Sequence, residues 1–269
     1  MRKALAFMLV VVLLSSIGTA GAEDASKIEI VVFAAASMTE ALQRIAGQYQ
    51  AVAPNVTLTF NFDSSGTLQT QIEEGAYADV FISASQKQMD ALDASAGIDK
   101  NPDAQDFLLQ GSRFDLLTNT VVLIVPEGSD KGITSFADAG TDKVDLIALG
   151  NSDVPVGQYA QEIFAFLGFW DQLNTAGKVT FASNVKEVLS QVAQAAVDCG
   201  VVYVSDAATG TGITVAANAP AGSHKPVNYP AAVLSNTMQP EAARAFLYYL
   251  KGEEATGVFT EIGFAIPQR

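Results

Sequence analysis

The chain has 269 residues, of which 49% are hydrophobic, so it can bury one large core or two smaller ones. Its 15 Lys and Arg residues against 29 Asp and Glu residues give a formal net charge of −14, and the absence of a basic cluster argues against a nucleic-acid partner. A single cysteine, Cys199, and a single histidine, His224, exclude an intrachain disulfide, a zinc cage and a Cys/His cluster.

The first 22 residues have the pattern of a secretory signal peptide. Arg2 and Lys3 precede an apolar run from Ala4 to Leu14, and small residues follow up to Ala22, after which we expect cleavage. The apolar run is about half of the ~20 residues that a spanning helix needs, which disfavours a membrane anchor. No cysteine lies near the cleavage site, so lipid attachment there is excluded. The sequence predicts an exported, soluble protein.

From Lys27 onward, short apolar strands alternate with amphipathic helices, which is typical of α/β proteins with crossover helices. The predicted strands are Ile28–Phe33, Val56–Phe62, Ala78–Ile82, Val121–Val125, Val144–Leu149, Val179–Ala182, Val201–Val204 and Ala231–Leu234. The predicted helices are Thr39–Tyr49, Thr67–Glu74, Val156–Leu167, Val185–Ala196, Glu241–Leu250 and Glu253–Ile262.

Two stretches are the expected places for the chain to cross between two lobes. They are Asn101–Gln110 and the polar, Pro- and Gly-containing Ala216–Pro230. We therefore predict a first lobe of residues 27–108 plus about 225–269, and a second lobe of about 109–224, with a ligand cleft between them.

Four helix starts follow strands and contain small or hydroxyl residues. They are Ala34–Glu40, Asp63–Leu68, Asp153–Tyr159 and Ser183–Glu187. The first and the last contain pairs at capping-box spacing, Ser37 with Glu40 and Asn184 with Glu187. In the second, Gly66 lets another group approach the backbone closely, and in the third, Pro155 suits the first turn of a helix. Each start leaves backbone N–H groups unpaired at the positive end of a helix dipole, which favours an anion site without Lys or Arg. Ordinary capping is the better explanation of any one of them taken alone.

Enzyme signatures are absent from the sequence, which contains no G-x-S-x-G elbow, no G-x-x-x-x-G-K-[ST] loop and no H-E-x-x-H helix. A Ser-His-Asp triad would have to use His224, which lies in the loop-like stretch Gly222–Pro226 and is expected to be exposed. We expect Cys199 to be a small semi-buried thiol without a redox role. The sequence therefore favours a protein that is not an enzyme.

Five strings of the chain form a recognisable set: Val32–Ser37, Ser64–Leu68, Tyr77–Ala84, Val154–Ala160 and Gly200–Tyr203. Together they resemble the periplasmic molybdate-binding proteins of ABC importers, and the similarity runs in unbroken order from about Ile28 to Phe264. The resemblance implies an α/β fold of type II periplasmic-binding-protein topology. Its two lobes, each a sheet flanked by helices, would close over a tetrahedral oxyanion.

The resemblance also implies a ligand set. It places the contacts on the hydroxyls of Ser37 and Ser65, the backbone N–H groups of Val156 and Val185, and the phenol of Tyr203, with the N–H groups of Ser37 and Ser65 contributing too. The chain departs from the family in having Val156 where Ala is frequent and Asn184 where Asp is frequent. Because Val156 would bind through its backbone, a larger side chain should be tolerated there.

These implications predict a monomeric periplasmic protein that captures molybdate, and also tungstate, and delivers it to a membrane ABC permease. No cofactor is expected, and no metal beyond the molybdate oxyanion. Two alternatives stay open: a binder of a smaller oxyanion such as sulfate or phosphate, and a secreted serine hydrolase that would use Ser65.

Overall fold

The apolar strands form two five-stranded sheets within residues 27–268, the part of the chain that the computed structural model describes. From edge to edge, the first sheet contains β2 (Val56–Asp63), β1 (Ile28–Ala35), β3 (Val80–Ile82), β10 (Val227–Val233) and β4 (Phe114–Asn119). The second contains β7 (Val179–Ala182), β6 (Ile147–Gly150), β8 (Cys199–Tyr203), β5 (Val121–Pro126) and β9 (Ile213–Asn218). The predicted signal peptide, residues 1–22, lies outside the described residues.

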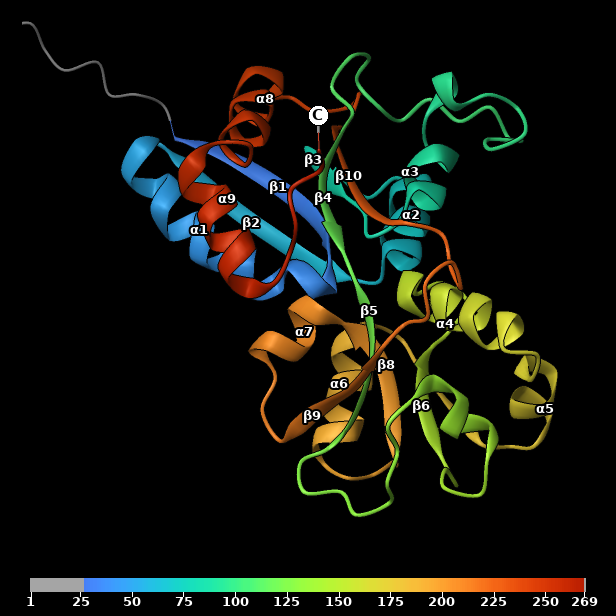
Figure 1. Ribbon diagram of the computed structural model, residues 1–269. Coiled ribbons are helices and arrows are strands. Elements are labelled where there is room, and N and C mark those ends of the chain that lie inside the picture. Colours follow the sequence, from blue (N-terminus) through green and yellow to red (C-terminus); the bar gives the residue numbers. More distant parts are fainter. Residues whose placement is uncertain (1–26, 269) are drawn as a thin grey trace, which may run out of the picture.

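Each sheet is flanked by helices and forms its own lobe (Figure 1). The first lobe carries η1 (Ala36–Met38), α1 (Thr39–Val52), α2 (Ser65–Glu73), α3 (Gln86–Ala91), η2 (Ala94–Ala96), α8 (Pro240–Tyr249) and α9 (Glu253–Ile262). The second lobe carries η3 (Phe136–Gly140), α4 (Pro155–Phe166), α5 (Trp170–Thr175), α6 (Val185–Ala193) and α7 (Val204–Thr209). This architecture confirms the predicted two-lobed α/β fold.

The central strands are apolar on both faces because helices cover both faces of each sheet. All residues of β6 and β8 are buried, as are Val121–Val125 of β5. Helix α6 packs closely on the second sheet at Gly200, where an added Cβ would lie 2.7 Å from a methyl group of Val192 on α6. None of the helices in the described part of the chain is long and apolar enough to cross a membrane.

The first crossing between the lobes differs from our prediction. We expected it within Asn101–Gln110, but β4 pairs with β10, so residues 109–119 belong to the first lobe and the chain crosses at Thr120. The polar residues Asp115 and Thr118–Thr120 interrupt the apolar pattern and conceal that β4 leads directly into β5. The return crossing lies between β9 and β10, at residues 219–226.

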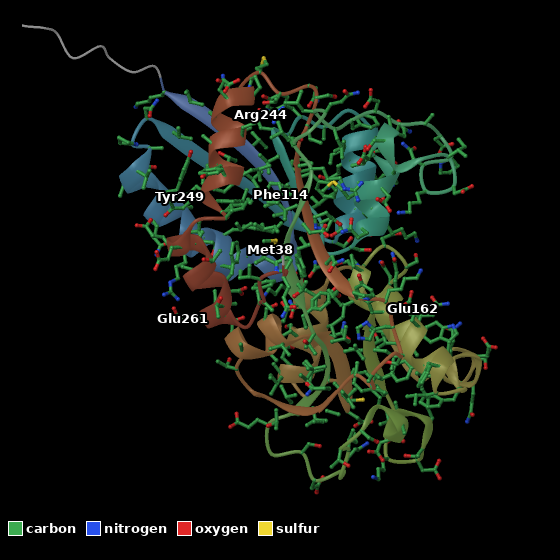
Figure 2. The ribbon with its side chains drawn as sticks, turned by 45° about the horizontal axis from the view of Figure 1, so that its top comes forward. Met38, Phe114, Glu162, Arg244, Tyr249 and Glu261 are labelled. Carbon is green, nitrogen blue, oxygen red and sulfur yellow. The ribbon has the colours of Figure 1, made fainter. Side chains whose placement is uncertain are left out.

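Parallel strands of both sheets end at the junction between the lobes. In the first sheet β1 runs parallel to β2 and β3, and in the second β6 runs parallel to β7 and β8. Met38, at the end of α1 that faces the second lobe, is fully buried there, whereas Arg244 on α8 lies on the far side of the first lobe (Figure 2). The helix starts that follow these strands therefore meet at one place.

Candidate functional site

A small cavity between the lobes is lined by residues at or just after the carboxyl ends of six parallel strands, β1, β2, β3, β6, β7 and β8. It contains about 200 Å³ of space not filled by atoms. The structure brings all of the sequence-predicted ligand residues to its wall, namely Ser37, Ser65, Val156, Val185 and Tyr203. Their side chains or backbones come from both lobes, so the cavity exists only where the lobes meet.

Ser37 follows β1 and is almost fully buried. Its Oγ lies 2.9 Å from the phenol oxygen of Tyr229 on β10, and that oxygen accepts a hydrogen bond of 3.3 Å from Nδ2 of Asn119. The Tyr229 proton is then free to point at Ser37, which leaves the Ser37 hydroxyl proton free for the cavity. Sequence reasoning missed both partners, because each lies far from Ser37 in the chain.

The expected capping role of Ser37 and Glu40 is wrong. No side chain caps η1 or α1, because Ser37 is turned toward Tyr229. The Glu40 carboxylate instead accepts a hydrogen bond of 2.7 Å from Lys186 of the second lobe. Glu40, which has the spacing of a capping-box residue, therefore contributes to a contact between the lobes.

Ser64 and Ser65 have different roles at the start of α2. Ser64 is the N-cap residue, and its Oγ accepts the Thr67 N–H at 3.1 Å. Ser65 is the first residue of this helix, and its Oγ accepts the Ala84 N–H at 2.9 Å. That bond occupies a lone pair of the Ser65 oxygen and leaves its O–H proton available to a ligand.

The other lobe contributes the first turns of α4 and α6. Asn184 caps α6, and its Oδ1 accepts the N–H groups of Lys186 and Glu187 at 3.0 and 3.1 Å. Pro155, the first residue of α4, has no N–H to satisfy. Within residues 27–268 the N–H groups of Val156 and Val185 have no hydrogen-bond partner, and both residues line the cavity.

The phenol of Tyr203 completes the wall. Tyr203 is 1% exposed, and its Oη has no hydrogen-bond partner among the described residues. Burial raises the pKa of Tyr203 well above its usual value of 10, so the phenol keeps its proton at neutral pH. The rings of Tyr159 and Tyr229 pack edge-on against the Tyr203 ring, with centroids 6.5 and 6.0 Å away, and fix its position.

An ion-pair group next to the cavity joins one lysine to two carboxylates. Lys186, one residue after Val185, lies 3.0 Å from the fully buried Asp206 and 2.7 Å from Glu40. Burial raises the pKa of Asp206, although the Lys186 ammonium opposes the change. Burial would lower the pKa of Lys186, but Asp206 and Glu40 raise it overall, so the lysine stays charged and paired. Sequence reasoning missed Asp206, which no motif marks.

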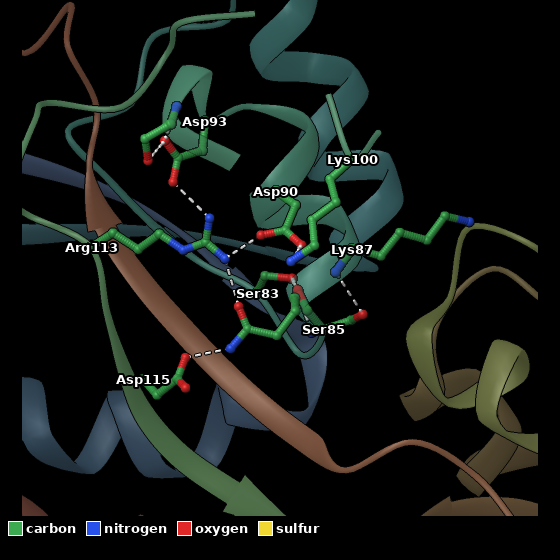
Figure 3. A network of polar contacts seen from close by, with 10 residues as sticks. Ser83, Ser85, Lys87, Asp90, Asp93, Lys100, Arg113 and Asp115 are labelled. Atoms are coloured by element: carbon green, nitrogen blue, oxygen red, sulfur yellow. Dashed lines mark hydrogen bonds and ion pairs between the residues drawn. The ribbon is translucent and has the colours of Figure 1, made fainter. Parts of the chain in front are cut away.

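The strongest cationic cluster of the first lobe lies elsewhere and is neutralised. Figure 3 shows the Arg113 guanidinium between the carboxylates of Asp90 and Asp93, with Nη1 2.7 Å from Asp93 Oδ2 and Lys100 close to Asp90. Because these carboxylates already satisfy the arginine, the network braces α3 against β4 and offers no free charge to an anion.

Within residues 27–268, Ser65 and His224 do not form a serine-hydrolase pair. Ser65 accepts a hydrogen bond from the Ala84 N–H, and no hydrogen bond joins it to His224. His224, expected to be exposed, is half-buried beside the Tyr159 ring and lies 2.6 Å from the Lys225 carbonyl oxygen. Burial, together with the neighbouring Asp198 carboxylate, raises the pKa of Cys199 to about 12. Cys199 is fully buried, so its thiol is neither ionised nor accessible at neutral pH. In the part of the chain described here, no group of His, Cys, Asp and Glu side chains could hold a metal ion.

Comparison with known proteins places these features in a family. The chain is 38% identical to the molybdate-binding protein ModA of Escherichia coli (strain K12) over 93% of this chain and 94% of that protein. It is 34% identical to ModA of Haemophilus influenzae over 91% of this chain and 93% of its relative. The structure of the periplasmic molybdate-binding protein of Azotobacter vinelandii superposes with a TM-score of 0.76 at 25% identity, covering 89% of this chain and all of that one. Residues 30–265 match the family of bacterial extracellular solute-binding proteins, and the chain belongs to this family.

Proposed function

We propose that this protein captures molybdate in the cavity between its lobes and delivers it to an ABC permease in the membrane. The observation that carries the proposal is the convergence of hydroxyl and N–H donors from both lobes on one small cavity between them. Ser37 and Ser65 contribute from the first lobe, and Val156, Val185 and Tyr203 contribute from the second.

The chemistry of these donors suits a fully deprotonated oxyanion. The Ser65 oxygen accepts the Ala84 N–H, and the Ser37 oxygen lies where it can accept the Tyr229 hydroxyl proton, so both serine protons can be donated to a ligand oxygen. The starts of α2, α4 and α6 add the positive ends of their helix dipoles. Neutral donors hold a dianion without a buried Lys or Arg, and this supports release to the permease.

One carboxylate, Asp63, also lines the cavity. Its Oδ1 accepts the Ser64 N–H at 2.7 Å, which directs that oxygen into the turn before α2. The long-range repulsion expected from the protein's negative charge is screened beyond about 8 Å at physiological ionic strength. Local donors and dipoles therefore decide whether an anion binds.

We also assign several finer properties to this function. Tungstate, an oxyanion of the same geometry and charge, should bind the same donors. The signal peptide is removed after Ala22, and the mature protein acts in the periplasm as a monomer, without a cofactor and without catalysing a reaction. The hinge at Thr120 and at residues 219–226 allows the lobes to close when a ligand contacts both of them.

A thermal-shift panel tests the proposal. Ligand at about a thousand times its dissociation constant adds roughly 4 kcal/mol to the free energy of unfolding, and the melting temperature of a chain of this size should rise by several degrees. We expect this rise with molybdate and tungstate. No shift with molybdate, together with a clear shift with phosphate, would assign the cavity to a different oxyanion.

A further inference from the structure

The second residue of α2 contacts the opposite lobe directly. The N–H group of Gly66 donates a hydrogen bond of 2.9 Å to the carbonyl oxygen of Asp153, in the loop between β6 and α4. This N–H belongs to the first turn of α2 and has no partner within its own helix. The contact therefore joins the first turn of α2 to the loop that precedes α4, across the cleft.

Only a glycine fits at this contact. A Cβ atom on residue 66 would lie 2.4 Å from the carbonyl oxygen of Asp153 and 2.8 Å from both its Cα and its Cβ. Real Cβ atoms essentially never approach backbone atoms so closely, and a backbone cannot swing aside as a long side chain can. The two lobes would have to move apart to admit even a methyl group.

The local backbone does not itself require glycine. Gly66 is absent from the residues with positive φ among those described, and it lies inside a helix, where alanine is the more favourable residue. Removing the opposite lobe would therefore remove the need for glycine. The requirement arises from Asp153 alone, and it exists only while the lobes are together.

The contact lies between two walls of the cavity. Gly66 directly follows Ser65, and Asp153 is followed by Val154, Pro155 and Val156, all of which line the cavity. Separating residue 66 from Asp153 would move the Ser65 hydroxyl away from the Val156 N–H. A ligand could then not be held by both at once.

We propose that Gly66 is the positioning residue that permits lobe closure over the ligand, an inference that rests on the proposed capture of molybdate. Its missing side chain lets α2 come within hydrogen-bond distance of Asp153, and its N–H group secures the closed arrangement. A methyl group at this position holds the lobes apart, and the donors of the two lobes no longer reach one oxyanion together.

The test compares Gly66→Ala with Gly47→Ala in full-length mature protein. Gly47 lies in α1, is exposed, and has no atom within 4 Å of an added Cβ, so it controls for the gain in helix propensity. By calorimetry, Gly66→Ala should weaken molybdate binding about ten- to a hundredfold, whereas Gly47→Ala should match the wild type. Small-angle scattering should show that molybdate contracts the wild type and Gly47→Ala but not Gly66→Ala.

The unliganded melting temperature separates closure from folding. Gly66→Ala should melt no lower than the wild type without ligand, because the clash is absent when the lobes are apart. Equal molybdate affinity in Gly66→Ala and wild type would overturn the inference, as would a lower melting temperature of unliganded Gly66→Ala. Failure of the wild type to bind molybdate would instead contradict the proposed function, so the two failures are distinguishable.

Discussion

The Oγ atom of Ser37 and the phenol oxygen of Tyr229 lie 2.9 Å apart, although 192 residues separate them in the chain. Both side chains are buried, and the Tyr229 oxygen also accepts a hydrogen bond from Asn119, the last residue of β4 before the chain crosses to the second lobe. The hydroxyl of a proposed ligand residue thus lies against a group that is itself held next to the crossing between the lobes.

Replacement of Tyr229 by phenylalanine should weaken molybdate binding while leaving the pocket lined as before. Loss of one oriented hydrogen bond is worth about 1 kcal/mol, or roughly fivefold in dissociation constant. Calorimetry measures the change. Tyr49→Phe, in the core of the first lobe against Phe246, removes a similar hydroxyl and should leave the affinity unchanged. Equal affinities of Tyr229→Phe and wild type would show that Ser37 needs no such partner.

Ser64 and Ser65 should respond differently to substitution by alanine. Ser65→Ala removes a proposed ligand hydroxyl and should weaken molybdate binding by about 1–3 kcal/mol. It also leaves the Ala84 N–H without its partner, so the unliganded protein should lose stability as well. Ser64→Ala removes the N-cap of α2 and should cost about 1 kcal/mol of stability with little change in affinity.

The molybdate affinities of these two variants decide which serine hydroxyl binds the ligand. Calorimetry gives the molybdate affinity of each variant, and thermal melting gives its unliganded stability. If Ser64→Ala loses affinity while Ser65→Ala keeps it, the ligand hydroxyl belongs to Ser64.

Asp138 should contribute stability that is lost in acid. Its carboxylate lies 2.6 Å from the Lys143 ammonium and accepts the N–H groups of Thr134 and Ser135, contacts that hold the pKa of Asp138 well below its unfolded value of about 3.9. A lowered folded pKa stabilises the protein above that unfolded value, and the contribution disappears as the pH falls through and below it.

The melting temperature of the wild type should therefore fall as the pH drops from about 5 to 3, and Asp138→Asn should flatten this dependence. Asp142→Asn, at a nearby exposed position, is the control, and its melting temperature should depend on pH as that of the wild type does. Parallel curves for wild type and Asp138→Asn would rule out the role of this carboxylate.

Local patterns predicted the elements whose ends carry clear signals. The strand Val179–Ala182 and the helix Glu253–Ile262 have the predicted bounds, since apolar periodicity and flanking polar residues mark both. Strands β4 and β9 were missed, because β4 is interrupted by polar residues and β9 is largely exposed. Missing β4 displaced the first lobe boundary by about ten residues, because a boundary drawn after residue 108 assigns this strand to the second lobe.

The site was predictable in part only. The helix starts show in the sequence as small and hydroxyl residues after strands, and family resemblance named the five positions proposed as ligands. Their meeting at one cavity depends on two sheets facing each other, which no local pattern encodes. Tyr229, Asn119 and Asp153 act through contacts between distant segments, so spacing gave no indication of them.

The most direct test of the account is titration calorimetry of the mature protein with molybdate, tungstate, sulfate and phosphate under identical conditions. The donors are neutral and cannot distinguish dianions by charge, so selectivity must come from fit. A smaller tetrahedron leaves at least one buried donor unpaired, at about 1–3 kcal/mol each. We predict that molybdate and tungstate bind at least about tenfold more tightly than sulfate and phosphate. Equal or tighter binding of sulfate or phosphate would contradict the account.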